Sequence, residues 1–173
     1  MSKIALYEGI KADLLNLPYT KGDNTEDTIK HVALWRNQIV REPEEIPFLY
    51  PAVFIEFLTS NYLESSSKAY QELEMTVRLH ICFESYKDED LDILRLTQTV
   101  YSTMQLKAYS SSMGYFGVMK RRNEEQNFDH PNVQDFMQDY SVGKAKDYYK
   151  DERPSVNGTV DTLVTIKEIV EEI

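Results

Sequence analysis

A chain of 173 residues is long enough for one well-cored domain and short for two. Its apolar fraction of 42% is that of an ordinary soluble globular protein, which excludes wholesale disorder. The net charge of −10 excludes simple electrostatic binding to nucleic acid or to an anionic membrane surface. A single cysteine, Cys82, excludes an intramolecular disulfide and suits a reducing cytoplasm. Because we find no secretion signal and no apolar run of about 18 residues, we expect no membrane partner.

The first predicted element is a helix over residues 2–17. Leu6, Ile10, Leu14 and Leu17 recur at helical spacing and would form its apolar stripe, which Ile4 and Tyr7 widen. Pro18 then ends the helix, because its ring cannot follow helical backbone.

Short polar and apolar segments alternate over residues 19–58. A polar loop is expected over 19–27, followed by a strand over 28–40 that is partly covered on both sides. Residues 41–50 form an acidic, proline-bearing connection. Pro51 opens a short strand over 52–58, a position at which proline costs no hydrogen bond inside a sheet.

The clearest pattern in the chain lies in residues 71–86. Apolar side chains alternate strictly with polar ones, which predicts a long strand with one face on a core and the other toward solvent. His80 and Cys82 fall on the face that is expected to meet solvent. The core-facing residues are Leu73, Met75, Val77, Leu79, Ile81 and Phe83.

A second helix is expected to begin near Asp88 and to run to about Leu106, with an acidic first turn that suits the helix dipole. Its apolar stripe is predicted to comprise Leu91, Leu94, Tyr101 and Met104, with Ile93, Thr97 and Val100 beside it. The remainder is predicted as a strand over 115–122, a polar loop or edge continuation over 123–131, a weak strand over 133–140, a mobile charged segment over 144–153 and a last strand over 160–170.

No sustained alternation of strands with crossover helices appears in this order of elements. We therefore predict a single α+β domain over residues 1–173, with a mainly antiparallel β-sheet and two helices packed on one of its faces.

Residue patterns for catalysis or metal binding are mostly missing. The acidic run 88–92 opens like a calcium loop, but Ile93 stands where such a loop needs glycine. His80 and Cys82, two apart on one strand, would lie about 7 Å apart, too far for direct proton transfer. No phosphate-cradling glycine loop is present. We therefore expect no catalytic residue, no cofactor and no metal, and expect that the protein is not an enzyme.

The twelve tyrosines are a high number for this length, and several lie in predicted loops or near element ends. Rigid amphipathic rings at such positions suit protein interfaces, although any one of them could equally border the core. Together they favour a role in protein–protein contact.

Three segments of the chain resemble the phage tail terminator and tail-completion (neck) proteins. They are the opening helix over 6–14, the proline-led strand over 50–57, and the long alternating strand that leads into the helix from Asp88. The resemblance covers roughly residues 2–106, with the C-terminal third matching only in being rich in strands.

This resemblance implies a structural virion protein that is assembled in the host cytoplasm. Such a protein forms a homo-oligomeric, commonly hexameric ring that caps the tail tube and joins it to the head–neck connector, while DNA passes through its lumen without specific binding. The acidic balance of the chain would then repel the DNA phosphates. The connection 41–50 is the predicted docking segment, with Glu44, Glu45, Phe48, Leu49 and Tyr50 as candidate interface residues. The alternative is a surface connection whose aromatic side chains fold back on the core.

Two other classes of function stay open. One is a cytoplasmic protein-binding adaptor module that uses an exposed sheet face and has no catalytic activity. The other is a small enzyme with a site assembled from dispersed residues such as His80, Glu84 and Asp129.

Overall fold

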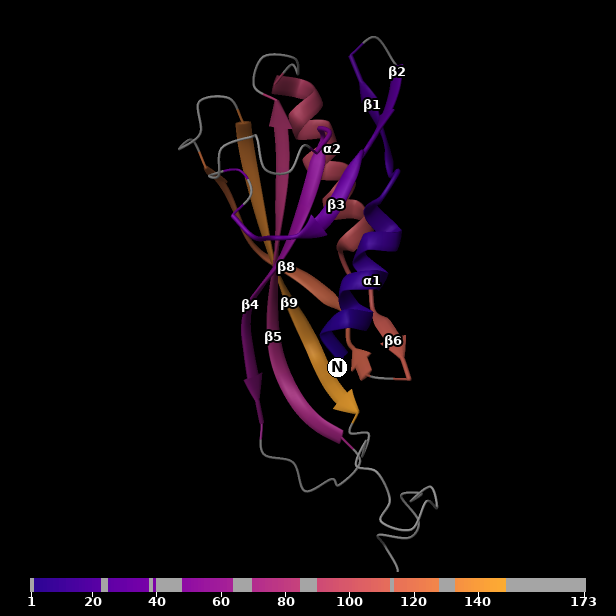
Figure 1. Cartoon of the computed structure of the whole chain (residues 1–173), viewed down its shortest axis with the longest axis vertical. Coiled ribbons are helices and arrows are strands. Elements are labelled where there is room, and N and C mark those ends of the chain that lie inside the picture. The colour runs from indigo at the N-terminus through magenta and orange to yellow at the C-terminus, as the bar shows by residue number, and fades with distance from the viewer. Residues whose placement is uncertain are drawn as a thin grey trace, which may run out of the picture.

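A computed structural model of the chain describes residues 2–22, 25–37, 39, 48–63, 70–84, 90–112, 114–127 and 133–148. Helices and strands follow one another in an order that gives no repeated βαβ unit (Figure 1). The elements are α1 (Ser2–Leu14), β1 (Pro18–Lys21), β2 (Thr25–Thr28), β3 (His31–Leu34), β4 (Ala52–Tyr62), β5 (Tyr70–Glu84), α2 (Asp90–Met104), β6 (Tyr109–Ser111), β7 (Gly114–Phe116), β8 (Met119–Asn127) and β9 (Val133–Tyr148).

Most strands join one seven-stranded sheet in the order β3-β4-β5-β9-β7-β6, with β8 also paired to β9. Among the described strands of this sheet, β3 and β4 pair in parallel and the other pairs are antiparallel. Strands β1 and β2 form a separate antiparallel hairpin. The expected α+β fold with a mainly antiparallel sheet is therefore confirmed.

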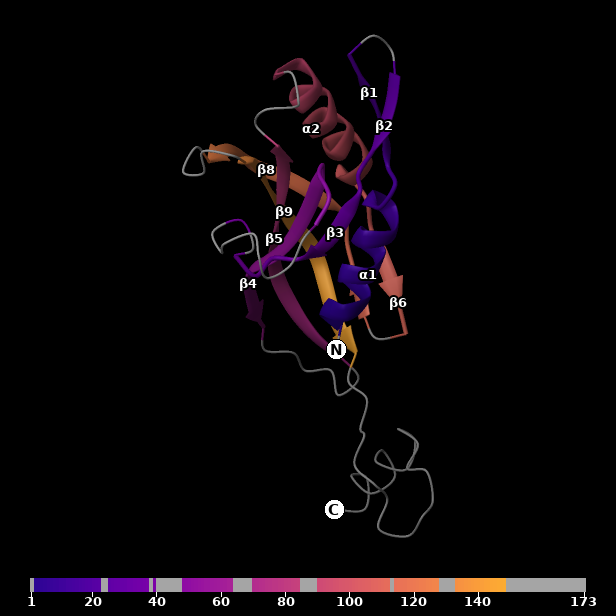
Figure 2. The same ribbon diagram turned by 45° about the horizontal axis from the view of Figure 1, so that its top comes forward.

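The alternating pattern of the long strand is confirmed by β5. All six of its predicted core residues, from Leu73 to Phe83, are buried, with at most 3% of their surface exposed. They share one core with Leu6, Ile10 and Leu14 of α1 and with buried residues of α2. Both helices thus cover the same face of the sheet, here called the first face (Figure 2).

Helix α2 is where expected but is turned about its axis relative to the prediction. Leu91 and Leu94 are 60% and 54% exposed, so their place in the buried stripe was wrong. Spacing alone allowed either stripe, because apolar residues occur on both sides of this helix. The side chains that enter the core are Ile93, Leu96, Thr97, Val100 and Met104.

The strand predicted over 28–40 is confirmed only over the short strand β3, His31–Leu34, and its predicted bounds were wrong. Its first residue, Thr28, is instead the last residue of β2. The loop predicted over 19–27 was wrong as well, since β1 and β2 form a hairpin there. This hairpin is held to α2 by the buried Asp92, whose Oδ1 accepts a hydrogen bond of 2.8 Å from the Gly22 N–H and also contacts Arg95 at 3.1 Å. The acidic run that resembled a calcium loop therefore includes a carboxylate with a structural role.

The C-terminal strands are longer than their local sequence suggests. The segment predicted over 115–122 breaks at Gly117 into β7 and β8, and β8 continues to Asn127 as an edge strand. The weak strand predicted from residue 133 extends to Tyr148, so mobility from 144 to 148 was wrong. Pairing with β5 on one side and with β7 and β8 on the other supplies the hydrogen bonds that hold this charged sequence. The strand predicted over 160–170 lies outside the described residues.

Candidate functional site

The sheet face opposite the helices, here called the second face, carries a smaller cluster of its own. Ala52, Phe54 and Cys82 are fully buried there. Because successive strand residues point to opposite faces, these side chains alternate with those of the main core. Partly buried residues that pack against them are Ala33, Trp35, Ile39, Phe48, Tyr50 and Val133.

His80 lies in the middle of this face, and its predicted exposure to solvent was wrong: only 4% of its surface is exposed. The Trp35 ring, which follows directly after β3, stacks on the imidazole with 3.8 Å between ring centroids and 6° between planes. Alternation along a strand assigns a residue to a face, but it does not show what covers that face. Here Trp35, which follows a strand distant in sequence, supplies the cover.

A buried hydrogen-bond network connects three strands through this histidine. His80 Nδ1 lies 2.9 Å from Asp135 Oδ2 on β9, and Nε2 lies 3.1 Å from Glu56 Oε2 on β4. When both ring nitrogens carry a proton, both donate to a carboxylate. Because each ring nitrogen faces a carboxylate, this geometry suits a cross-link between strands better than a general base with a free nitrogen.

An ion pair extends this network along the second face. Arg78 on β5 contacts Asp139 on β9 through two hydrogen bonds, 2.6 Å from Nε to Oδ1 and 2.9 Å to Oδ2. The two residues are also direct register partners. The second face is therefore tied by side chains as well as by the backbone ladder.

The thiol of Cys82 is held in a protonated, weakly reactive state. Burial, together with the neighbouring Asp135 carboxylate, raises the pKa of Cys82 well above its usual value. The thiol lies 3.8 Å from Asp135 Oδ1, so Cys82 and His80 meet through Asp135 rather than each other. Since the thiolate is the nucleophile, a thiol with a raised pKa is a poor one.

Cys82 is accordingly expected to resist alkylation and disulfide exchange in the native protein. With Ellman's reagent at neutral pH, the folded chain should react negligibly and the chain in guanidinium should release about one equivalent. A Leu49→Cys variant, at a position that is 71% exposed, gives the rapid reaction of an accessible thiol as a control. Rapid stoichiometric reaction of the native wild-type chain would contradict the buried position of Cys82.

The predicted docking segment is described only at its end. Glu44 and Glu45 lie outside the described residues, while Phe48 and Tyr50 fold back onto the second face. The Phe48 ring lies 5.0 Å from those of Tyr50 and Phe54. Burial, with smaller contributions from Cys82 and Glu84, raises the pKa of Tyr50 to about 12. Leu49, between the two anchored rings, projects with 71% of its surface exposed.

The dispersed residues considered for an enzyme site are only partly placed. Glu84 lies half-buried at the end of β5, and Asp129 lies outside the described residues. The partners that His80 does have, Glu56 and Asp135, were missed by sequence reasoning. The one available signal was Asp135, which shares a face of the strand predicted over 133–140 with apolar neighbours. Among the described residues, no group of three His, Cys, Asp or Glu side chains is placed to hold a metal ion.

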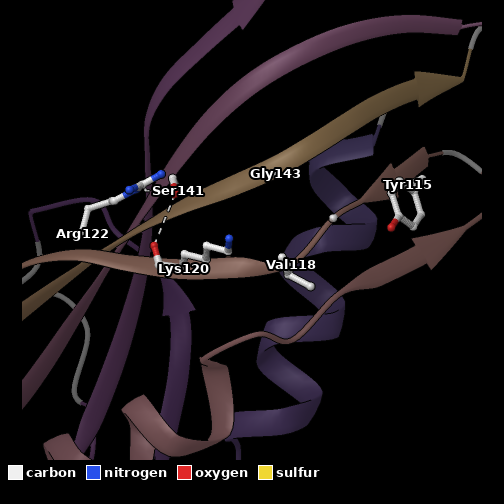
Figure 3. Close-up of a pocket in the computed structure, with 7 residues that line it drawn as sticks. Tyr115, Val118, Lys120, Arg122, Ser141 and Gly143 are labelled. Atoms are coloured by element: carbon white, nitrogen blue, oxygen red, sulfur yellow. Dashed lines mark hydrogen bonds between the residues drawn. The ribbon is translucent and has the colours of Figure 1, made fainter.

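A shallow pocket of about 340 Å³ lies elsewhere, where β7, β8 and β9 meet (Figure 3). Lys120 and Arg122 of β8 stand on one side, and Arg122 Nε donates to Ser141 Oγ of β9 at 2.8 Å. Both cationic side chains are exposed, so their contribution to binding an anion is screened by solvent. The pocket is an open surface hollow and defines no reaction. The remaining lining residues are Tyr115, Gly117, Val118 and Gly143.

The fold and the second face together define an α+β protein whose buried polar groups cross-link strands. No family model and no curated protein matches the chain. Among solved structures, a chain in the virion of a native gene transfer agent particle is similar, with a TM-score of 0.46 and 6% identity over 66% of this chain and 78% of that one. This likeness is partial in both extent and superposition. Neither described helix is long and apolar enough to span a membrane.

Proposed function

We propose that the chain is a structural protein of a tailed-phage-type virion. In this proposal several copies, commonly six, form a ring that caps the tail tube and joins it to the head–neck connector. The protein performs no catalysis and holds no cofactor. Its partners are further copies of itself, the tail-tube protein and the connector.

The observation that carries this proposal is the way the three segments of the resemblance come together. The opening helix forms α1, the proline-led segment forms β4, and the long strand β5 runs toward α2. Strands β4 and β5 pair along their lengths, and both helices cover the first face above them. A fold hosts many functions, so this support is an analogy of architecture.

Leu49 is the described residue of the predicted docking segment that is best placed to contact another subunit. Its neighbours Phe48 and Tyr50 are anchored on the second face, so the exposed leucine is held on a positioned backbone. A side chain presented in this way loses less conformational freedom on binding than one on an unanchored loop. The second face, whose strands are cross-linked by side chains, holds the two anchoring rings in place.

Leu49→Glu is expected to weaken self-association of the purified chain by about tenfold or more, because a charge would enter an apolar contact. Its thermal midpoint should stay near that of the wild type, since the leucine is already 71% exposed. Leu91→Glu, at a position 60% exposed on α2, is the matched control and should leave association unchanged. Sedimentation velocity over a concentration series measures the self-association of the wild type and of both variants, and thermal unfolding measures the midpoint. Equal association of all three proteins would remove Leu49 from the interface.

A protein-binding adaptor without catalysis is the second candidate function. In this function the same exposed leucine, Leu49, contacts another protein instead of a second copy of this chain. The two functions differ in self-association: an adaptor is a monomer or dimer at every concentration, whereas the ring protein assembles further.

A further inference from the structure

Two histidines on the second face have opposite chemical surroundings. Both nitrogens of the His80 ring face carboxylates, which accept hydrogen bonds from a protonated ring. His31, the first residue of β3, instead lies between aromatic rings. The centroid of its ring is 5.7 Å from that of Phe48 and 5.7 Å from that of Phe54. A charge on His31 therefore meets apolar carbon, where a charge on His80 meets oxygen.

The surroundings of His31 favour its neutral form. Burial lowers the pKa of His31, and the positive charge of Lys11 on α1 lowers it further. A protonated ring would gain some cation–π attraction from Phe48. Because the pKa is nevertheless lowered, the loss of hydration and the repulsion by Lys11 are the larger effects.

Within the described residues, the groups packed around His31 supply no compensating negative charge. On β4 they belong to the apolar run Ala52–Ile55. On the segment that carries Phe48, the ionisable group is Tyr50, which stays neutral in mild acid because burial raises its pKa to about 12. Lys30, which precedes His31, is paired with Asp27. A proton on His31 would therefore leave an uncompensated charge among aromatic rings.

The ring of His31 helps to position Leu49. Phe48 stacks on His31, with 29° between the ring planes. The Phe48 ring is also 5.0 Å from the rings of Tyr50 and Phe54. Leu49 follows directly in the chain, and 71% of its surface is exposed. A change in the charge of His31 thus acts on a ring that fixes the backbone next to Leu49.

We propose that His31 is an acid-sensitive anchor, and that protonation of its ring loosens Phe48 and frees Leu49 from its fixed position. In the released form, the solvated His31 would titrate near the ordinary pKa of about 6.5. The anchored form resists the proton, so the released form binds more protons and gains population as the pH falls below about 6.5. The gain is limited to about tenfold for each pH unit, down to the lowered pKa of the anchored form.

The consequence for assembly rests on the proposed function. If copies of the chain contact one another through Leu49, release of its backbone in acid restores the conformational freedom that binding must remove. Self-association of the wild type should then weaken by up to about tenfold between about pH 7.5 and about pH 5.5. His31→Phe, whose ring stacks without titrating, should associate equally at both pH values.

Electron paramagnetic resonance of a nitroxide label at position 49 tests the anchor in the full-length chain. Leu49→Cys provides the attachment site, because the native thiol of Cys82 is buried. With His31 present, the ratio of immobile to mobile spectral components should fall by about threefold to tenfold between about pH 7.5 and about pH 5.5. In a His31→Phe background, and in His31→Gln, which is neutral but not aromatic, this ratio should not respond to pH. A label on Leu91→Cys of α2, at a position 60% exposed, is the control and should not respond either.

A ratio at position 49 that stays constant within about twofold over this pH range, or that falls equally in His31→Phe, would overturn the proposal. Tighter immobilisation in acid would overturn it too, because cation–π attraction would then outweigh the loss of hydration.

Sedimentation velocity of the same labelled samples separates this result from the proposed ring. Release in acid by a chain that is a monomer throughout would support the anchor and remove the ring. A ring whose label at position 49 does not respond to pH would support the ring and remove the anchor.

Discussion

Gly117→Ala is expected to destabilise the protein by about 3 kcal/mol or more, because the new methyl group would collide with backbone. A Cβ atom at this position would stand 1.9 Å from the carbonyl oxygen of Gly143 and 2.8 Å from its carbonyl carbon. No side-chain rotation can relieve a contact between two backbone segments. The connection between β7 and β8 would have to move away from β9, on which both strands pair.

The opposite glycine supplies the matched control. Gly143 N–H donates to the Val118 carbonyl at 3.2 Å, so the two segments are bonded where they cross. A Cβ on Gly143 would lie 3.5 Å from the Val118 oxygen, an ordinary contact, and Gly143→Ala should change stability by less than about 1 kcal/mol. Urea unfolding of both variants gives the comparison. Similar losses for the two substitutions would contradict the close crossing.

His80→Ala is expected to cost about 3–5 kcal/mol, the effect of removing one partner from a buried polar pair. The loss would leave the Asp135 carboxylate, only 1% exposed, with the weakly donating Cys82 thiol as its remaining side-chain contact among those described above. It would also open the space beneath Trp35, whose ring stacks on the imidazole. The effect should appear as a lower denaturant midpoint with an unchanged slope.

A double-mutant cycle with Asp135→Ala separates the network from simple loss of packing. If the two side chains stabilise the fold through their hydrogen bond, the double variant should lose less than the sum of the single losses, by about 1 kcal/mol or more. Arg122→Ala, which removes only an exposed hydrogen bond to Ser141, is the reference and should lose less than about 0.5 kcal/mol. Strictly additive losses for His80 and Asp135 would rule out the coupling.

The parts of the fold that could be predicted are those whose cause is local. Strict alternation specified the buried face of β5, and helical spacing before Pro18 specified α1 with Leu6, Ile10 and Leu14 in the core. In both cases a single element, read by itself, already contained the periodicity that burial requires. The mainly antiparallel α+β class followed from the order of such elements.

What could not be predicted depends on contacts between distant segments. His80 is buried because Trp35 covers it and because Asp135, on a strand fifty-five positions later, reaches its ring. The end of β9 is a strand because β5 and β7 offer it partners, although its charged sequence predicts mobility. In α2, two alternative stripes fitted the spacing, and packing on the first face decided between them. The predictions of a single domain and of the interface residues Glu44 and Glu45 concern parts of the chain beyond the described residues.

Native mass spectrometry of the purified full-length chain across a range of concentrations, with negative-stain images of the same samples, tests the proposed ring most directly. The account predicts a closed assembly of about six copies, a symmetric form typical of homo-oligomers. The share of the protein in this assembly should rise with concentration. It also predicts that Leu49→Glu shifts this assembly toward smaller species while Leu91→Glu does not. A monomer or dimer at every concentration would contradict self-assembly into a ring and would favour the adaptor function.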